Sequence, residues 1–251
     1  MDIEFTFAKN SLPLNFHIRN GKIYLYDDIP SYVKFDEEQL RLHENTSYLV
    51  DASIAGRKTT THCGDRHIVT SEAETLHYVS HLIKPGRDKN ILKIVQQNDI
   101  CEIETYYIEY IKSHTIQCYS VIKNISKKSF SLEYISSFAK YDFLSYHAYD
   151  KVDFYLPSNA WFLEAQWKTH TLEELGIVSP NNIKSFKKFS ISNTGAWSTK
   201  NYIPCGIFND HVKNSFIMFQ IEANGSWQYE FGDYLKNVTF HLSGPTLEEN
   251  G

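Results

Sequence analysis

Hydrophobic and polar residues alternate along much of the chain, which is typical of β-strands with one face in a core and one face in water. Near the start, the run 14–18 alternates in this way, and Asn20-Gly21 separates it from the apolar run 22–26. Asn and Gly both tolerate positive φ angles, so this dipeptide between two such runs predicts a β-hairpin. The chain is therefore expected to open with two antiparallel strands.

The same alternation returns in later segments: 130–134, 152–156, 227–231 and 238–242. Two further segments, 101–111 and 215–222, carry large residues on both faces and are expected to lie between two layers or against a second domain. Roughly a dozen such segments at short spacing predict an all-β fold, a large antiparallel β-sandwich.

Helix signals are sparse. The clearest is Thr171–Gly176, where Thr171 and Glu174 can form a capping box and Gly176 can end the turn. This segment is short, so it predicts one helical turn within a loop. The polar stretches 84–90 and 179–185 predict surface loops, and the sequence contains no evident linker or repeat. Residues 1–251 are therefore expected to form a single domain.

Composition and charge narrow the function classes. The chain has 251 residues, and 42% of them are hydrophobic, which is enough for a sizeable core and argues against disorder. The net charge of −5 argues against a nucleic-acid partner, which normally needs a basic surface. No apolar run approaches the roughly 18 residues of a membrane span. The acidic start lacks the pattern of a signal peptide, so we expect a cytoplasmic protein without membrane partners.

Cysteine and histidine spacing does not indicate a metal site or a cofactor. The four cysteines are scattered without a CxxC pair, and we interpret them as reduced thiols: Cys63, Cys101, Cys118 and Cys205. His62 and His67 flank Cys63, but their spacing in a loop is a poor match to zinc ligands. A nucleophilic Cys63–His pair is also disfavoured, because nothing marks an oxyanion hole or an orienting third group.

Several motifs in the second half of the chain resemble one family. They are FKKFSISNTGAWSTKNYIPCGIF (186–208), MFQIEANGSWQYEFGD (218–233) and LSGP (242–245). Upstream, LHYVSH (76–81), LEYISSFA (132–139) and PSNAWFLEAQWKTHTLEELGI (157–177) follow the same order. From about residue 46 to 249 the sequence resembles the N-terminal β-supersandwich domain of glycoside hydrolase family 36 (GH36) α-galactosidases.

The resemblance implies a domain that does not itself catalyse. In this family a (β/α)₈ barrel follows the β-domain and carries an Asp nucleophile and an Asp acid/base, and neither signature occurs here. A retaining glycosidase needs two carboxyl groups about 5–5.5 Å apart. The resemblance implies that this chain alone is inactive and that the complete enzyme cleaves terminal α-galactosyl oligosaccharides. It also implies a docked barrel, homo-oligomer contacts and no cofactor.

One loop is the candidate substrate contact. Segment 56–67 is dense in charged and polar residues between apolar runs, and such loops on β scaffolds often carry function. By resemblance it reaches toward the sugar site, where a common form reads Gly-Asp-x-Arg. Here Gly64-Asp65-Arg66 places Arg one residue early. Asp65, Arg66 and His62 are the candidate sugar contacts, and Arg57 could also donate hydrogen bonds. The alternative is a solvated turn.

Four tryptophans pose a similar choice, because an indole can stack on a sugar or pack in a core. Trp227 alternates with other aromatic residues, and Trp197 follows a Thr-Gly pair at the end of a strand. Core or domain-interface packing is favoured for each of the four. Trp161 and Trp167 flank an irregular stretch that by resemblance faces the barrel. These two are the candidates for contact with a sugar or a partner.

Two other function classes stay open. An independent carbohydrate-binding module would need an exposed row of aromatic residues on one sheet face. A stand-alone enzyme within the β-sandwich would need a cluster of His, Asp or Glu residues, for which the sequence offers no motif.

Overall fold

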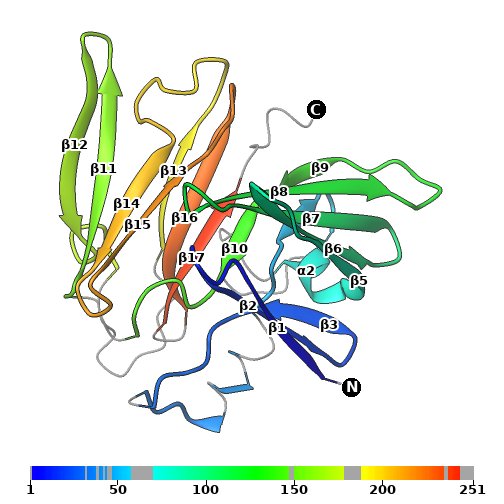
Figure 1. The fold of residues 1–251 in the computed structure, drawn as a ribbon. Helices are drawn as coiled ribbons and strands as arrows, with labels where there is room; N and C mark the ends of the chain where they lie inside the picture. Colours follow the sequence, from blue (N-terminus) through cyan, green and yellow to red (C-terminus); the bar gives the residue numbers. More distant parts are fainter. Residues whose placement is uncertain are drawn as a thin grey trace. The chain divides into compact units, whose positions relative to one another are not determined.

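The structure is a computed structural model of the chain that describes residues 2–31, 33–37, 40–41, 43, 47–57, 70–146, 150–177, 188–234 and 237–243. It is almost entirely β, and the chain forms two compact units, Met1–Lys140 and Tyr141–Gly251 (Figure 1). The predicted all-β fold of antiparallel sheets is confirmed. The single-domain organisation stays a prediction, because two compact units can fold together or separately.

The first unit contains two larger antiparallel sheets and a short strand pair. The first sheet has the order β1-β2-β3, with strands Ile3–Phe7, Leu14–Arg19 and Lys22–Leu25. The second sheet is the meander β5-β6-β7-β8, with strands His77–Lys84, Lys89–Gln97, Cys101–Tyr110 and Thr115–Asn124. Strand β4 (Ala52–Ile54) pairs with β9 (Leu132–Ile135), and β10 spans Phe138–Lys140.

The alternation of apolar residues explains how the sheets of the first unit pack. Leu14 and Phe16 on β2 are completely buried, as are Ile103 and Tyr107 on β7. The ring of Phe16 meets the ring of Tyr107 edge-on, with centroids 5.3 Å apart. The β1-β2-β3 sheet therefore packs on the meander through the face that the period-2 pattern makes apolar.

The second unit is a sandwich of two sheets. One has the order β12-β11-β14-β15, with strands Leu163–Thr171, Val152–Ala160, Cys205–Asp210 and Ser215–Gln220. The other contains β13 (Lys188–Asn193), β16 (Trp227–Tyr234) and β17 (Asn237–Ser243), and β16 lies between β13 and β17. Figure 1 shows the two sheets side by side in this unit.

Aromatic rings fill the space between these two sheets. Phe154 on β11 is completely buried. Its ring centroid lies 4.8 Å from that of Phe231 on β16 and 4.7 Å from that of Phe208 on β14. Trp227 and Tyr229 on β16 are also completely buried. The alternation in 152–156 and 227–231 is thus confirmed as the inner face of the sandwich.

The local turn predictions are confirmed where the structure describes them. Asn20 and Gly21 both have positive φ, 51° and 73°, and join β2 to β3 as a hairpin. In segment 171–176, the Thr171 amide donates to Glu174 Oε2 at 2.9 Å, and the Glu174 amide donates to Thr171 Oγ1 at 3.2 Å. The stretch 84–90 forms the exposed turn between β5 and β6, whereas 179–185 lies outside the described residues.

Two local features differ from expectation. A short helix, α2 (Ser71–Thr75), begins after the N-cap Thr70, which the hydrophobic pattern did not indicate. In segment 215–222, Phe216 and Met218 are largely exposed, at 68% and 61%, so one face of β15 is not sandwiched between layers of its own unit. None of the helices that the structure describes is long and apolar enough to span a membrane.

Candidate functional site

The predicted sugar contacts of the loop cannot be placed. Asp65, Arg66 and His62 all lie in 58–69, outside the described residues. Their role therefore stays a prediction. The described residues on either side, Arg57 and Thr70, show how the two ends of this segment are held.

Arg57 fixes the entry of the segment. Its amide donates to the carbonyl of Ile54 at 3.0 Å, which turns the chain directly after β4. Its guanidinium Nε lies 2.6 Å from Glu72 Oε1, and Nη2 lies 3.8 Å from Asp99 Oδ1. The Glu72 side chain is completely buried, so Arg57 supplies the opposite charge that a buried carboxylate requires.

Thr70 fixes the exit of the segment. Its Oγ1 accepts the amide of Ala73 at 3.2 Å and caps α2. Its own amide donates to Asp51 Oδ1 at 3.3 Å, beside β4. Because β4 and α2 hold both ends, the segment 58–69 leaves and re-enters the same corner of the first unit.

Asn98 links α2 to the turn before β7 by hydrogen bonds. Its Nδ2 donates to Glu72 Oε2 at 2.9 Å and to Thr75 Oγ1 at 3.0 Å. Its Oδ1 accepts the amides of Ile100 and Cys101 at 3.0 and 2.9 Å. The amide group of Asn98 is thus occupied by structural bonds.

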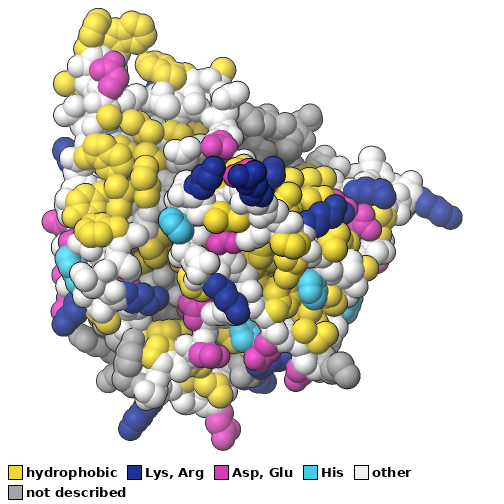
Figure 2. Space-filling model, viewed as in Figure 1, with side chains coloured by type: hydrophobic (Ala, Val, Ile, Leu, Met, Phe, Trp, Pro, Cys, Tyr) yellow, Lys and Arg dark blue, Asp and Glu magenta, His cyan; other side chains and the backbone are white. Residues whose placement is uncertain are grey.

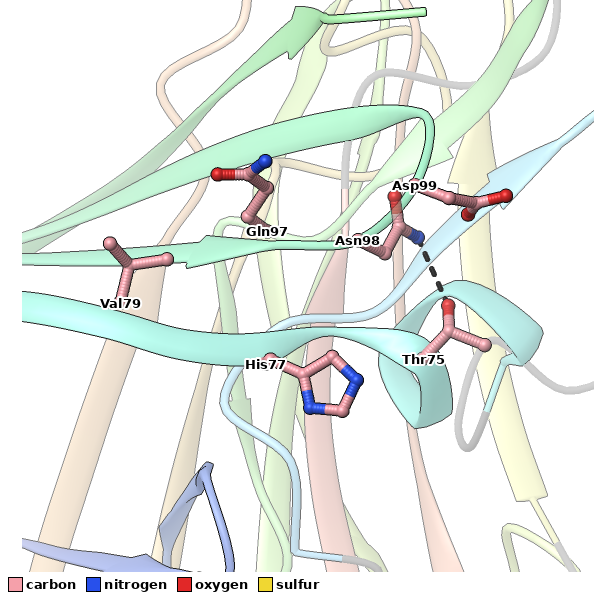
Figure 3. A pocket seen from close by; sticks show the side chains of 6 residues that line it. All are labelled: Thr75, His77, Val79, Gln97, Asn98 and Asp99. Atoms are coloured by element: carbon pink, nitrogen blue, oxygen red, sulfur yellow. Dashed lines mark hydrogen bonds between the residues drawn. The ribbon is translucent and has the colours of Figure 1, made fainter.

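An open groove of about 450 Å³ lies beside Asn98 (Figure 3). Its lining comprises Thr75, His77, Val79, Gln97, Asn98 and Asp99. Asp99 is the one carboxyl group in this lining, whereas a retaining glycosidase needs two. The groove therefore lacks the acid pair that glycoside cleavage requires.

The second unit carries the two predicted tryptophans on the β11–β12 hairpin. Trp161 stands in its turn, where it is 71% exposed beside Phe162, whose φ is 65°. The Trp161 ring lies edge-on to that of Trp197, with centroids 6.2 Å apart. Trp167 is 43% exposed on β12, opposite Pro157.

The structure places one of the four tryptophans in the core of the second unit. Core packing is confirmed for Trp227, which is completely buried and stacks on Tyr229. Trp161, Trp167 and Trp197 are 43–71% exposed, so they do not pack in the core of their own unit. Domain-interface packing of these three stays a prediction.

The described cysteines are poorly suited to nucleophilic chemistry. Cys101, Cys118 and Cys205 are free thiols. Burial raises the pKa of the Cys101 thiol to about 12, and it also raises the pKa values of Cys118 and Cys205. Since the thiolate is the reactive form, these three are inert near neutral pH. Cys63 and His67 lie outside the described residues.

Comparison with solved structures gives the class of fold. The chain superposes on the GH36 α-galactosidase AgaB from Geobacillus stearothermophilus with a TM-score of 0.66 at 13% identity, covering 98% of this chain and 37% of AgaB. The α-galactosidase from Lactobacillus brevis superposes with a TM-score of 0.66 at 14% identity, which covers 99% of this chain and 37% of that protein. A variant of AgaA from Geobacillus stearothermophilus, in complex with stachyose, superposes with a TM-score of 0.64 at 14% identity. This match covers 98% of this chain and 38% of the AgaA variant.

These likenesses show the fold. The chain has the fold of a portion of GH36 α-galactosidases, as the sequence resemblance predicted, and spans a little over a third of the length of those proteins. No protein-family model matches the sequence, and no curated protein matches it. The activity and substrates of a whole enzyme therefore belong to the proposal below.

Proposed function

We propose that the chain is the non-catalytic N-terminal domain of a retaining α-galactosidase that acts on terminal α-galactosyl oligosaccharides. The observation that carries this proposal is the likeness to GH36 α-galactosidases across at least 98% of the chain but about 37% of theirs. A variant of one of these proteins was solved in complex with stachyose, an oligosaccharide of this class. The catalytic carboxylates would come from the barrel.

In this proposal, the segment 58–69 shapes the sugar site from outside the barrel. The anchoring of its ends supports this role, because Arg57 and Thr70 attach it to the paired strand β4 and to the helix α2. A loop whose base is fixed in this way loses less conformational entropy when it contacts a ligand. Asp65 and Arg66 would then meet sugar hydroxyls by charge-assisted hydrogen bonds.

The exposed apolar residues of the second unit would form contacts to a second copy of the chain. The register places Trp167, Tyr155, Ile207, Met218 and Phe216 on the outer face of the β12-β11-β14-β15 sheet. Figure 2 shows hydrophobic side chains gathered over these strands and at the tip of the β11–β12 hairpin.

The area of this surface fits a subunit interface. Five aromatic side chains are 43–84% exposed there: Trp161, Phe162, Trp167, Trp197 and Phe216. At about 200 Å² for a whole aromatic side chain, their exposed parts amount to roughly 600 Å². One partner in a stable interface buries about 800 Å², so these rings alone would supply most of it.

The same rings favour the alternative, an independent carbohydrate-binding module. Trp161 and Trp197 lie close together and exposed at one hairpin tip, and Trp167 lies exposed on β12. The module would be supported if the isolated chain binds a glycan and the variant Trp161→Ala loses that binding. If the isolated chain binds no glycan, the module is excluded and the enzyme-domain proposal stands.

Two experiments test the main proposal. The reading frame beyond Gly251 should continue into several hundred residues with a barrel strand that ends in the nucleophilic Asp. In that complete protein, Asp65→Asn should lower kcat/KM for an α-galactoside about tenfold or more, because a charged hydrogen bond is lost. The matched control Asp88→Asn removes an exposed carboxylate from the β5–β6 turn and should leave kcat/KM unchanged. Equal effects of both substitutions would contradict the role of the loop.

A further inference from the structure

A groove of about 500 Å³ lies within the second unit, on the other side of the sheet from the apolar surface described above. It is lined by residues of β11, β12, the turn after β12, β13 and Tyr202. Strand β12 is the outer strand of its sheet, and β13 is the outer strand of the sheet that faces it. The groove therefore lies beside the outer strands of the two sheets.

The groove carries two basic side chains on one face of one strand. Lys168 lies opposite Leu156, and His170 lies opposite Phe154, so the register puts both on the core side of the sheet. Apolar residues fill the corresponding positions of β11, whereas β12 has a lysine and a histidine there. Within the described part of the chain, neither side chain has a hydrogen-bond or ion-pair partner.

Acidic groups are missing from the lining. Among the lining residues there is no Asp and no Glu. Nearby, a carboxylate oxygen of Glu174 accepts the amide of Thr171, and Glu230 lies 3.5 Å from Lys188. No acidic side chain of the lining would therefore repel an anion bound beside Lys168 and His170.

The rest of the lining combines hydroxyl groups with an apolar floor. Hydroxyl groups come from Ser158, Ser190, Ser192 and Tyr202, and apolar surface comes from Leu156, Leu175, Phe189 and Ile191. The Ser158 hydroxyl also donates to the carbonyl of Gln166 at 3.2 Å. A lining that mixes hydroxyl groups with apolar side chains suits the hydroxyl groups and the C–H face of a sugar ring. The volume lies within the range of small-molecule sites, about 300–1,000 Å³.

We propose that this groove binds an anionic monosaccharide, a hexose that carries a phosphate. Lys168 and His170 bind the anionic group, and the serine hydroxyls on β11 and β13 bind the sugar hydroxyls. Such a site lies outside any catalytic barrel, so it fits an effector of the protein.

A lysine on the inner face of an outer strand has another use, because inward-pointing charges protect sheet edges from pairing with other chains. That use predicts a different behaviour. Removing Lys168 would then increase self-association without changing the affinity for any small anion. The proposed site predicts a loss of affinity at an unchanged oligomeric state.

Isothermal titration of the whole chain tests the proposal with three probes: galactose 6-phosphate, galactose and inorganic phosphate. The expected result is binding of galactose 6-phosphate at one site per chain, at least about tenfold tighter than either of the other two. Lys168→Met should weaken this binding about tenfold or more, as expected for the loss of a charge-assisted hydrogen bond. The matched control Lys213→Met removes an exposed lysine from the β14–β15 turn and should bind as the parent does.

Three results would overturn the proposal. They are the absence of galactose 6-phosphate binding at millimolar concentration, equal affinity for inorganic phosphate, and equal binding by the parent and Lys168→Met. A melting curve of each variant separates lost binding from lost folding. If Lys168→Met unfolds, His170→Gln is used, and it too must weaken binding for the proposal to stand. The measurement does not involve glycoside cleavage, so it is independent of the proposed enzyme function.

Discussion

Gly206 lies in close contact with the aromatic core of the second unit. A Cβ atom added there would lie 2.6 Å from Cε2 and Cζ of the Phe154 ring and 2.9 Å from Cε1 of Phe219. Real Cβ atoms do not approach aromatic carbons so closely, so one of the rings must move. Phe154 cannot move freely, because it is completely buried against Phe208 and Phe231. The substitution Gly206→Ala therefore tests the core packing.

The expected cost follows from two opposing effects. Alanine in a strand gains about 0.5–1 kcal/mol over glycine, because glycine loses more backbone freedom on folding. Overpacking a well-filled core costs about 1–3 kcal/mol. The cost of overpacking is larger than the gain from alanine, so we expect Gly206→Ala to lower the free energy of unfolding by about 1–2 kcal/mol. Urea denaturation followed by the fluorescence of the buried Trp227 measures this loss.

A double-mutant cycle identifies the cause. Phe154→Leu shortens the ring that the new methyl group would meet. Gly206→Ala should therefore cost less in the Phe154→Leu background, by about 0.5 kcal/mol or more. An unchanged or raised stability of Gly206→Ala would refute the packing argument, and so would the same cost in both backgrounds.

Four further predictions concern the two units. Arg57→Met leaves the buried Glu72 carboxylate without its cation and should cost about 2–3 kcal/mol in urea denaturation, because Arg57 is one-third exposed and less than fully desolvated; an unchanged midpoint would show that the ion pair does not hold this corner. Raised pKa values should keep Cys101 and Cys205 unlabelled by iodoacetamide at pH 8 in the folded chain, which peptide mass mapping detects. The folded state holds the Cys101 proton more tightly than the unfolded state does. The stability that this group contributes is therefore retained below pH 9 and falls as pH rises from about 9 towards 12. Rapid labelling of these thiols, or a free energy of unfolding that rises over this pH range, would contradict their burial. Phe216→Ser should reduce self-association in light scattering at high concentration, and an equal molar mass of the variant and the parent would exclude this face as the contact.

Local turn chemistry could be predicted because its signals lie within a few residues. Asn20-Gly21 forms its hairpin, and Thr171 with Glu174 forms the capping box. The helix after Thr70 was missed because five residues are too few to show a helical period of apolar positions. A threonine followed by acidic residues in the next turn was the available signal.

The site features that were not predicted depend on pairing between distant residues. Arg57, Glu72 and Asn98 are separated along the chain, and each is unremarkable in its own sequence neighbourhood. Lys168 and His170 stand in an alternating strand, but their position on the core side follows from the register with β11. Exposure of Trp161 likewise follows from its place in a hairpin turn, which hydrophobicity alone does not reveal.

The proposed function makes this chain a scaffold whose catalytic groups reside elsewhere. The test is incubation of the purified chain with a chromogenic α-galactoside, beside the longer protein that the proposal expects. We expect the longer protein to release the chromophore and the chain alone to release none. Turnover by the chain alone that persists through repurification and disappears on unfolding would contradict it.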